Sequence, residues 1–168
     1  MKGQAVMEST MEDQSVIHST FVIEHSYTTS PERVFDAFAN PAKKRKWYGE
    51  RGSFDVEDFQ MDFRVGGVEL GRYRFKPGTP VPAGTPIVYD TTYQDIIPNR
   101  RIVLAYTVTL GAGRISSSLA TFEFLPTEKG TDLIFTEQGA YFEGADGPQI
   151  REAGHKHLLQ LLEDYLSS

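Results

Sequence analysis

The sequence predicts an α+β fold in which a curved antiparallel sheet of about seven strands wraps around one long C-terminal helix. Turn signals recur at regular intervals between segments whose apolar and polar residues alternate, which is typical of an antiparallel sheet. The long helical pattern at the end of the chain can cover one face of that sheet. A length of 168 residues with 39% hydrophobic residues suits one domain with a sizeable core.

The first fifteen residues differ from the rest of the chain. Residues 1–15 are polar and lack periodicity, so we expect a disordered tail followed by a single domain over residues 16–168. Alternation over residues 16–27 predicts the first strand.

Two short helices are expected after that strand. Ser30 before Pro31 is typical of a helix start, with the serine as N-cap and the proline in the first turn. A second short helix over residues 42–48 carries the single tryptophan, Trp47. The basic run at residues 43–46 is interpreted as a solvated face, because a short helix of an acidic protein is a poor anion-binding site.

The other strands are predicted from alternation between turn signals. Gly66-Gly67 is a hairpin signal, and we expect Gly67 to need a positive φ. Residues 76–86 hold too many proline and glycine residues for a strand and are predicted to form a loop. The predicted strands cover residues 54–65, 68–75, 87–97, 101–110, 114–125 and 131–138.

Residues 148–166 form the predicted C-terminal helix, which begins with a proline in its first turn. Its expected apolar face contains Gly154, Leu158, Leu162, Tyr165 and Leu166. Two polar residues, Arg151 and His155, fall on the N-terminal half of the same face. They either lie at a solvated rim or line a space between the helix and the sheet.

Strand parity brings a set of candidate site residues to one space. Inward-facing positions of neighbouring strands share the parity of their apolar residues, which places polar groups among them. The candidates are Tyr106, Ser118, Phe122, Phe135 and Glu137 from the sheet, Arg151 and His155 from the helix, and Trp47, Tyr48, Tyr89 and Tyr93 as aromatic lining.

Glu137 is the candidate with two open interpretations. It could pair with Arg151 or His155 as a structural ion pair that closes the mouth of a pocket. A carboxylate beside an imidazole in an apolar pocket could instead act as a general base, which makes Glu137 and His155 the candidate catalytic residues.

Composition and motifs exclude several classes of protein. The chain has no cysteine and a net charge of −6, so we expect neither a disulfide framework nor nucleic-acid binding. The chain lacks an apolar run of membrane-spanning length, a signal-peptide centre and a phosphate-binding glycine motif. His155 and His157 point about 200° apart on a helix, so we expect no metal site and no cofactor. The predicted location is cytoplasmic.

Six segments, in their order and spacing, carry a resemblance to a known family: residues 64–67, 95–103, 118–124, 130–131, 136–142 and 151–154. Together they resemble the SRPBCC superfamily, also called START-like or helix-grip, over about residues 18–166. Within it the chain looks like the bacterial branch named after the C-terminal domain of the heat-shock-protein ATPase activator. His155 departs from the pattern, since tryptophan or threonine is expected there.

The resemblance implies a helix-grip fold with a ligand pocket between the sheet and the long helix. Members bind lipids, polyketides, hormones or other apolar molecules, and some are cyclases or hydroxylase subunits. The expected function is therefore binding of a small, largely apolar molecule, with a role in stress response. An acid–base enzyme acting on such a ligand and a chaperone-interacting module are the alternatives. A chaperone and a second copy of the chain are the further candidate partners.

Overall fold

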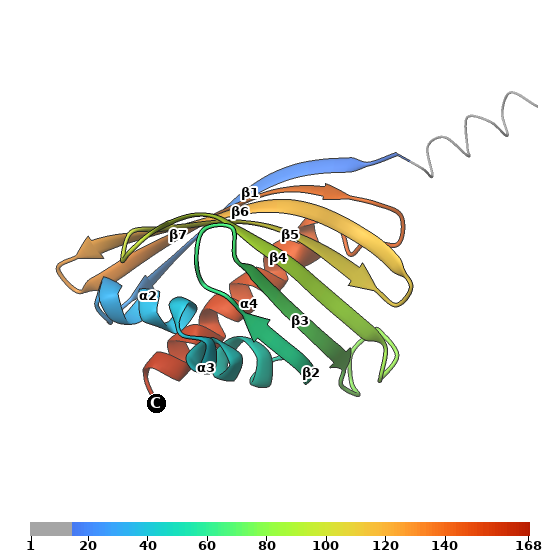
Figure 1. Ribbon diagram of the computed structural model, residues 1–168, viewed down its shortest axis with the longest axis horizontal. Helices are drawn as coiled ribbons and strands as arrows, with labels where there is room; N and C mark the ends of the chain where they lie inside the picture. The colour runs from blue at the N-terminus through green and yellow to red at the C-terminus, as the bar shows by residue number, and fades with distance from the viewer. Residues whose placement is uncertain (1–14) are drawn as a thin grey trace, which may run out of the picture.

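The computed structural model describes residues 15–168. The expected tail, residues 1–15, lies outside the described residues apart from Ser15. Within the described part, the chain folds into one curved sheet, a long C-terminal helix beneath it and shorter helices at one end of that layer (Figure 1). The predicted α+β class is confirmed. Within residues 15–168, no helix combines the length and apolar character needed to cross a membrane.

Seven antiparallel strands form the sheet in the order β1-β7-β6-β5-β4-β3-β2. Strands β2 to β6 are each hydrogen-bonded to the next strand along the chain, and β7 also pairs with β1 at the edge of the sheet. Their bounds are Ile17–Tyr27 (β1), Phe54–Met61 (β2), Val68–Phe75 (β3), Pro86–Ile97 (β4), Arg101–Leu110 (β5), Gly113–Thr127 (β6) and Gly130–Tyr141 (β7).

Two strands differ from their predicted bounds by three or more residues at one end. The strand predicted to reach residue 65 ends at Met61, because the chain turns through residues 62–67 before β3 begins. The last strand runs on to Tyr141 rather than residue 138, since β7 pairs along its length with both β1 and β6.

The helices α2 (Pro31–Ala39) and α3 (Pro41–Lys44) follow β1, as predicted. The Ser30 side chain accepts a hydrogen bond from the Arg33 N–H and so caps α2. Asn40 ends α2 and caps α3 with its side chain. The second predicted helix is longer and less regular than expected, because α3 continues into a π-helix, η1 (Arg45–Glu50).

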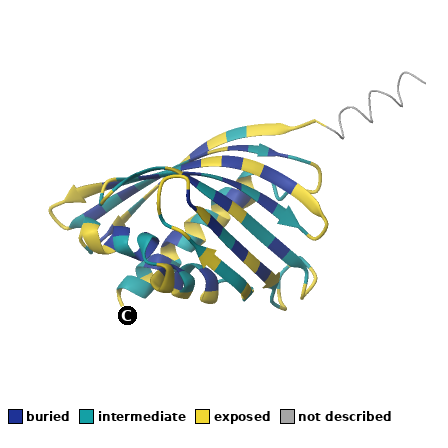
Figure 2. Cartoon of the chain, viewed as in Figure 1, coloured by how far each residue is buried: buried dark blue, intermediate teal, exposed yellow. Residues whose placement is uncertain are grey.

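Helix α4 (Pro148–Leu166) has the predicted bounds and crosses the concave face of the sheet (Figure 1). Its buried residues are Arg151, Leu159 and Leu162, whereas Gly154 is exposed and Leu158 half-buried. The predicted helix face is therefore correct at Leu162 and wrong at Gly154 and Leu158, because the buried face is turned toward Leu159. Along the strands, buried residues alternate with more exposed ones, seen as alternating dark and light bands in Figure 2.

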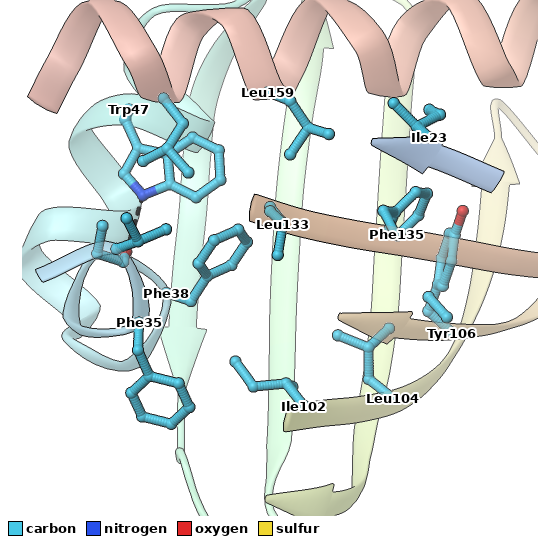
Figure 3. Packing of buried hydrophobic residues seen from close by; sticks show 14 of the residues in the cluster. Ile23, Phe35, Phe38, Trp47, Ile102, Leu104, Tyr106, Leu133, Phe135 and Leu159 are labelled. Carbon is cyan, nitrogen blue, oxygen red and sulfur yellow. Dashed lines mark hydrogen bonds between the residues drawn. The ribbon is translucent and has the colours of Figure 1, made fainter. Parts of the chain in front are cut away.

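The concave face carries the apolar core, and strand parity was predicted correctly there. Ile102, Leu104 and Tyr106 of β5 are all buried, and Leu133 and Phe135 are buried on β7. These side chains meet Leu159 from α4 and Trp47 from η1 in one layer (Figure 3). Polar residues of the same parity are therefore carried into this layer as well.

The turn before β3 generates a first prediction. Gly66, not Gly67, has the positive φ, of 81°. Gly67 is required for a different reason, because a Cβ there would lie 2.0 Å from the Asp62 carbonyl oxygen. Gly67→Ala should lower the free energy of unfolding by about 1–3 kcal/mol. At Gly113 a Cβ meets no atom within 4 Å, so Gly113→Ala is the matched control. Equal denaturant midpoints for both variants would contradict this account.

The rotation of α4 generates a second prediction. Leu159 and Leu162 are 3% and 0% exposed, so Leu→Ala at either should cost about 2–5 kcal/mol in urea unfolding. Leu158→Ala should cost less, because that side chain is half-buried and borders a cavity. Lys156→Ala on the exposed face should change stability by at most about 0.5 kcal/mol. A larger loss at Leu158 than at Leu159 would restore the predicted face.

Candidate functional site

A cavity lies between the concave face of the sheet and helix α4. Its walls are mostly apolar and aromatic, formed by Phe38, Trp47, Leu104, Phe122, Phe135 and Leu159 among others. It offers about 50 Å³ to the centres of water-sized spheres. One water molecule needs roughly 10–15 Å³ by that measure, so the space suits a small molecule.

The Glu137 carboxylate of β7 is the centre of a buried polar network beside the cavity. Its side chain is 0% exposed, and its Oε1 accepts a 2.5 Å hydrogen bond from the Tyr106 hydroxyl. The same oxygen lies 3.1 Å from His155 Nε2, which is also 3.2 Å from the Tyr106 hydroxyl. Three elements, β7, β5 and α4, therefore meet at one carboxylate oxygen.

Arg151 supports this network from behind and does not line the cavity. Its guanidinium makes two 2.8 Å hydrogen bonds to the Asp146 carboxylate and one of 3.0 Å to Ser116 Oγ. A fourth, of 3.2 Å, reaches the oxygen of Tyr106. With its donors directed to these groups, Arg151 fixes α4 and Tyr106 rather than contacting the cavity.

Tyr106 stays a neutral hydrogen-bond donor in this setting. Burial raises its pKa well above the ordinary value, the Glu137 charge raises it further, and Arg151 opposes the shift. In Figure 3 its hydroxyl is directed toward helix α4. The buried atoms Ser118 Oγ, Glu137 Oε2 and Tyr141 Oη have no hydrogen-bond partner among the described residues.

His155 reaches the cavity from helix α4, as Tyr106 does from the sheet. Its ring packs against Phe135 with centroids 4.7 Å apart and against Phe21 at 6.0 Å, and its side chain is 16% exposed. The Glu137 carboxylate and the Tyr106 hydroxyl both lie within 3.2 Å of one ring nitrogen, Nε2, and together they orient the imidazole. A ring held this way can present its other nitrogen to a bound molecule.

A second buried ion pair borders the other side of the cavity. Lys44 Nζ of α3 donates a 2.7 Å hydrogen bond to Glu69 Oε1 of β3, and the Tyr93 hydroxyl donates to the same oxygen at 2.6 Å. Lys44 and Glu69 are each 5% exposed, and both line the cavity. The ammonium also lies 5.1 Å from the centre of the Tyr48 ring.

The structure separates the predicted site residues into two groups. Those that line the cavity are Trp47, Tyr106, Phe122, Phe135 and His155, together with Tyr48 and Tyr89. Those that lie behind it are Tyr93, Ser118, Glu137 and Arg151, which contact lining residues or border them. Glu137 pairs with His155, and no direct hydrogen bond joins it to Arg151 in the described chain.

Lys44 and Glu69 are functional candidates that sequence reasoning missed. The interpretation of the basic run as a solvated face is wrong at Lys44, because that side chain turns inward to the carboxylate on β3. Glu69 carried a usable signal, since it has the inward parity of Gly71 and Tyr73 on the same strand. Across the described residues, no group of three or more metal-ligating side chains is placed to hold an ion.

Comparisons with known proteins place the chain in a family. The family model described as "Activator of Hsp90 ATPase homolog 1-like protein" matches residues 28–167. No curated protein matches the chain.

Solved structures resemble it over nearly their whole length. The Mll3558 protein from Rhizobium loti is 42% identical, with a TM-score of 0.78, over 90% of this chain and 99% of that one. An uncharacterized protein from Rhizobium leguminosarum is 36% identical, with a TM-score of 0.83, over 92% and 97%. An AHSA1-like protein from Aeromonas hydrophila, 17% identical over 89% and 92%, shares the fold with a TM-score of 0.63. The chain therefore belongs to the family of proteins like the activator of Hsp90 ATPase homolog 1.

Proposed function

We propose that residues 16–168 form a single domain that binds a small, largely apolar molecule carrying one polar group. The observation that carries the proposal is an apolar, aromatic cavity with one oriented imidazole, His155, at its edge. Ligand sites in proteins are commonly apolar pockets with a few placed polar groups. In this arrangement the cavity walls supply affinity and His155 orients the ligand.

The energetics of the cavity favour such a ligand. Burial of apolar surface contributes about 25 cal/mol per Å², so the aromatic walls favour binding of any apolar group that fits between them. The cavity is small, and three of its lining residues, Tyr48, Leu158 and His155, are half-buried. Small outward movements of these side chains would admit a longer molecule.

The π-helix η1 supports a functional role for this end of the cavity. π-helical turns are rare and are found frequently at functional sites. Here the turn carries Trp47 and Tyr48, adjacent in sequence, and both line the cavity. Trp47 is also fixed by a 2.8 Å hydrogen bond from its indole nitrogen to the Ala37 carbonyl.

An acid–base enzyme is the second candidate, and the contact between Glu137 and His155 favours it. A carboxylate that holds one imidazole nitrogen leaves the other nitrogen available to move a proton. In that reading His155 is the group facing the substrate and Glu137, away from the cavity, positions it.

A chaperone-interacting module with a stress-related, cytoplasmic role is the alternative that family membership supports. The family description names an activator of a chaperone ATPase, and that activity belongs to the named protein. A second copy of the chain is a further partner to be tested. Neither partner accounts for an oriented imidazole inside an apolar cavity, so we place ligand binding first.

The third prediction concerns binding in the cavity, and the single tryptophan serves as its fluorescent probe. Trp47 lines the cavity, so ligand entry should change its fluorescence. 1-Hexanol and hexane differ by one hydroxyl, and both should bind to the wild type. His155→Phe should weaken 1-hexanol about tenfold, the equivalent of one lost hydrogen bond, and leave hexane unchanged or tighter.

His157→Phe is the matched control, because His157 lies on the exposed face of the same helix. It should leave both affinities at the wild-type value. If neither ligand changes the Trp47 signal of the wild type, the ligand-binding proposal is wrong and the chaperone-interacting module is favoured. If His155→Phe leaves the affinity for 1-hexanol intact, the imidazole does not orient the ligand.

A further inference from the structure

The buried pair formed by Lys44 and Glu69 has no part in the proposed role of His155. Both residues line the same cavity, and each is 5% exposed. A buried ion pair is weak support for stability, because loss of hydration offsets most of the attraction between its charges. The position of this pair on a cavity wall therefore calls for another explanation.

The strand register fixes where this pair lies relative to the His155 end. Glu69 of β3 pairs with Thr91 of β4, and Thr91 pairs with Tyr106 of β5. All three line the cavity, so their polar groups form one row across strands β3, β4 and β5. Strands are spaced about 4.8 Å apart, which puts the Cα atoms of Glu69 and Tyr106 about 10 Å from each other. Tyr106 is the residue that contacts His155.

The Lys44 end keeps unused hydrogen-bonding capacity. The bond to Glu69 is the only one that the Lys44 ammonium makes to the described residues, although an ammonium has three donors. The Glu69 oxygen Oε2 and the Thr91 hydroxyl make no hydrogen bond to that part of the chain either. This end of the cavity therefore offers donors and acceptors side by side.

Charge decides which chemical group fits there. Lys44 and Glu69 neutralise each other. A carboxylate placed beside them would be attracted by the Lys44 ammonium and repelled by the Glu69 carboxylate. An uncharged group that both donates and accepts, such as a hydroxyl, matches Lys44 and Glu69 together. Across the cavity, His155 is already paired with the Glu137 carboxylate, so that end is no better suited to an anion.

We infer that the ligand is an uncharged, elongated molecule with an apolar body and a hydroxyl-type group at each end. One end is held by Lys44 and Glu69 and the other by His155, with the aromatic walls between them. This inference rests on the proposed function and adds to it a second polar subsite, a length and an absence of charge.

The test uses Trp47 fluorescence of the wild-type protein with a series of α,ω-diols, from hexane-1,6-diol to decane-1,10-diol. Each diol is compared with the primary alcohol of the same chain length. A site with two polar ends should favour the diol about tenfold at one chain length, the equivalent of one added hydrogen bond, and less at shorter or longer ones. The matching dicarboxylates should bind more weakly than the diols.

A variant assigns the preference to the subsite. Lys44→Met, Glu69→Leu and Tyr93→Phe together replace the three polar groups by apolar ones and leave none of them unpaired. Buried pairs replaced in this way commonly keep the fold, which thermal melting checks. The variant should bind each diol no better than its matching alcohol, whatever its affinity for the alcohols themselves.

The outcomes separate this inference from the proposed function. If alcohols and diols bind the wild type equally well at every length, the second subsite is wrong and the cavity proposal stands. If the dicarboxylates bind more tightly than the diols, the inferred lack of charge is wrong. If no alcohol or diol changes the Trp47 signal, the proposed function fails and the inference fails with it. The wild-type series decides between these outcomes even if the variant does not fold.

Discussion

Burial of the Glu137 carboxylate constrains how helix α4 can lie on the sheet. A carboxylate that is 0% exposed needs polar partners, and these come from β5, through the Tyr106 hydrogen bond, and from α4, through His155. His155 must therefore face the sheet, and Arg151, one turn earlier, follows it to reach Tyr106. Leu159 comes one turn after His155, which is why it is buried and Leu158 only half-buried. The polar residues thus set the rotation of the helix, and the leucines fill the face that results.

This constraint explains which parts of the fold could be predicted from the sequence. Strand parity was predictable because the side-chain period of a strand is two, so a few apolar residues assign Ser118 and Glu137 to the concave face. The bounds of α4 followed from Pro148 and the apolar repeat. The rotation of α4 could not be predicted in the same way, because adjacent leucines allow either of two neighbouring helix faces to be buried. Only contacts with distant strands select one of these faces.

The candidate site was less predictable for a related reason. Burial of Lys44 depends on Glu69, which lies 25 residues further along the chain. The local sequence pattern of a basic run does not indicate such a distant partner. Gly67 shows the same limit in the backbone, since its requirement arises from the approach of the Asp62 carbonyl rather than from its own φ. The aromatic lining was easier to predict, because Tyr48 and Tyr89 lie beside positions already assigned to the core.

Two ion pairs, Arg151 with Asp146 and Lys44 with Glu69, make different demands on the fold. Arg151 directs its donors to Asp146, Ser116 and Tyr106, so its loss would remove hydrogen bonds from three groups at once. Lys44 makes one hydrogen bond, beside a cavity, and an ammonium with free donors in a low-dielectric wall interacts strongly with any acceptor that enters. A structural ion pair is most stabilising when its donors are satisfied within the chain. Arg151 meets that condition and Lys44 does not, which is the pattern expected when one pair serves the fold and the other serves a ligand.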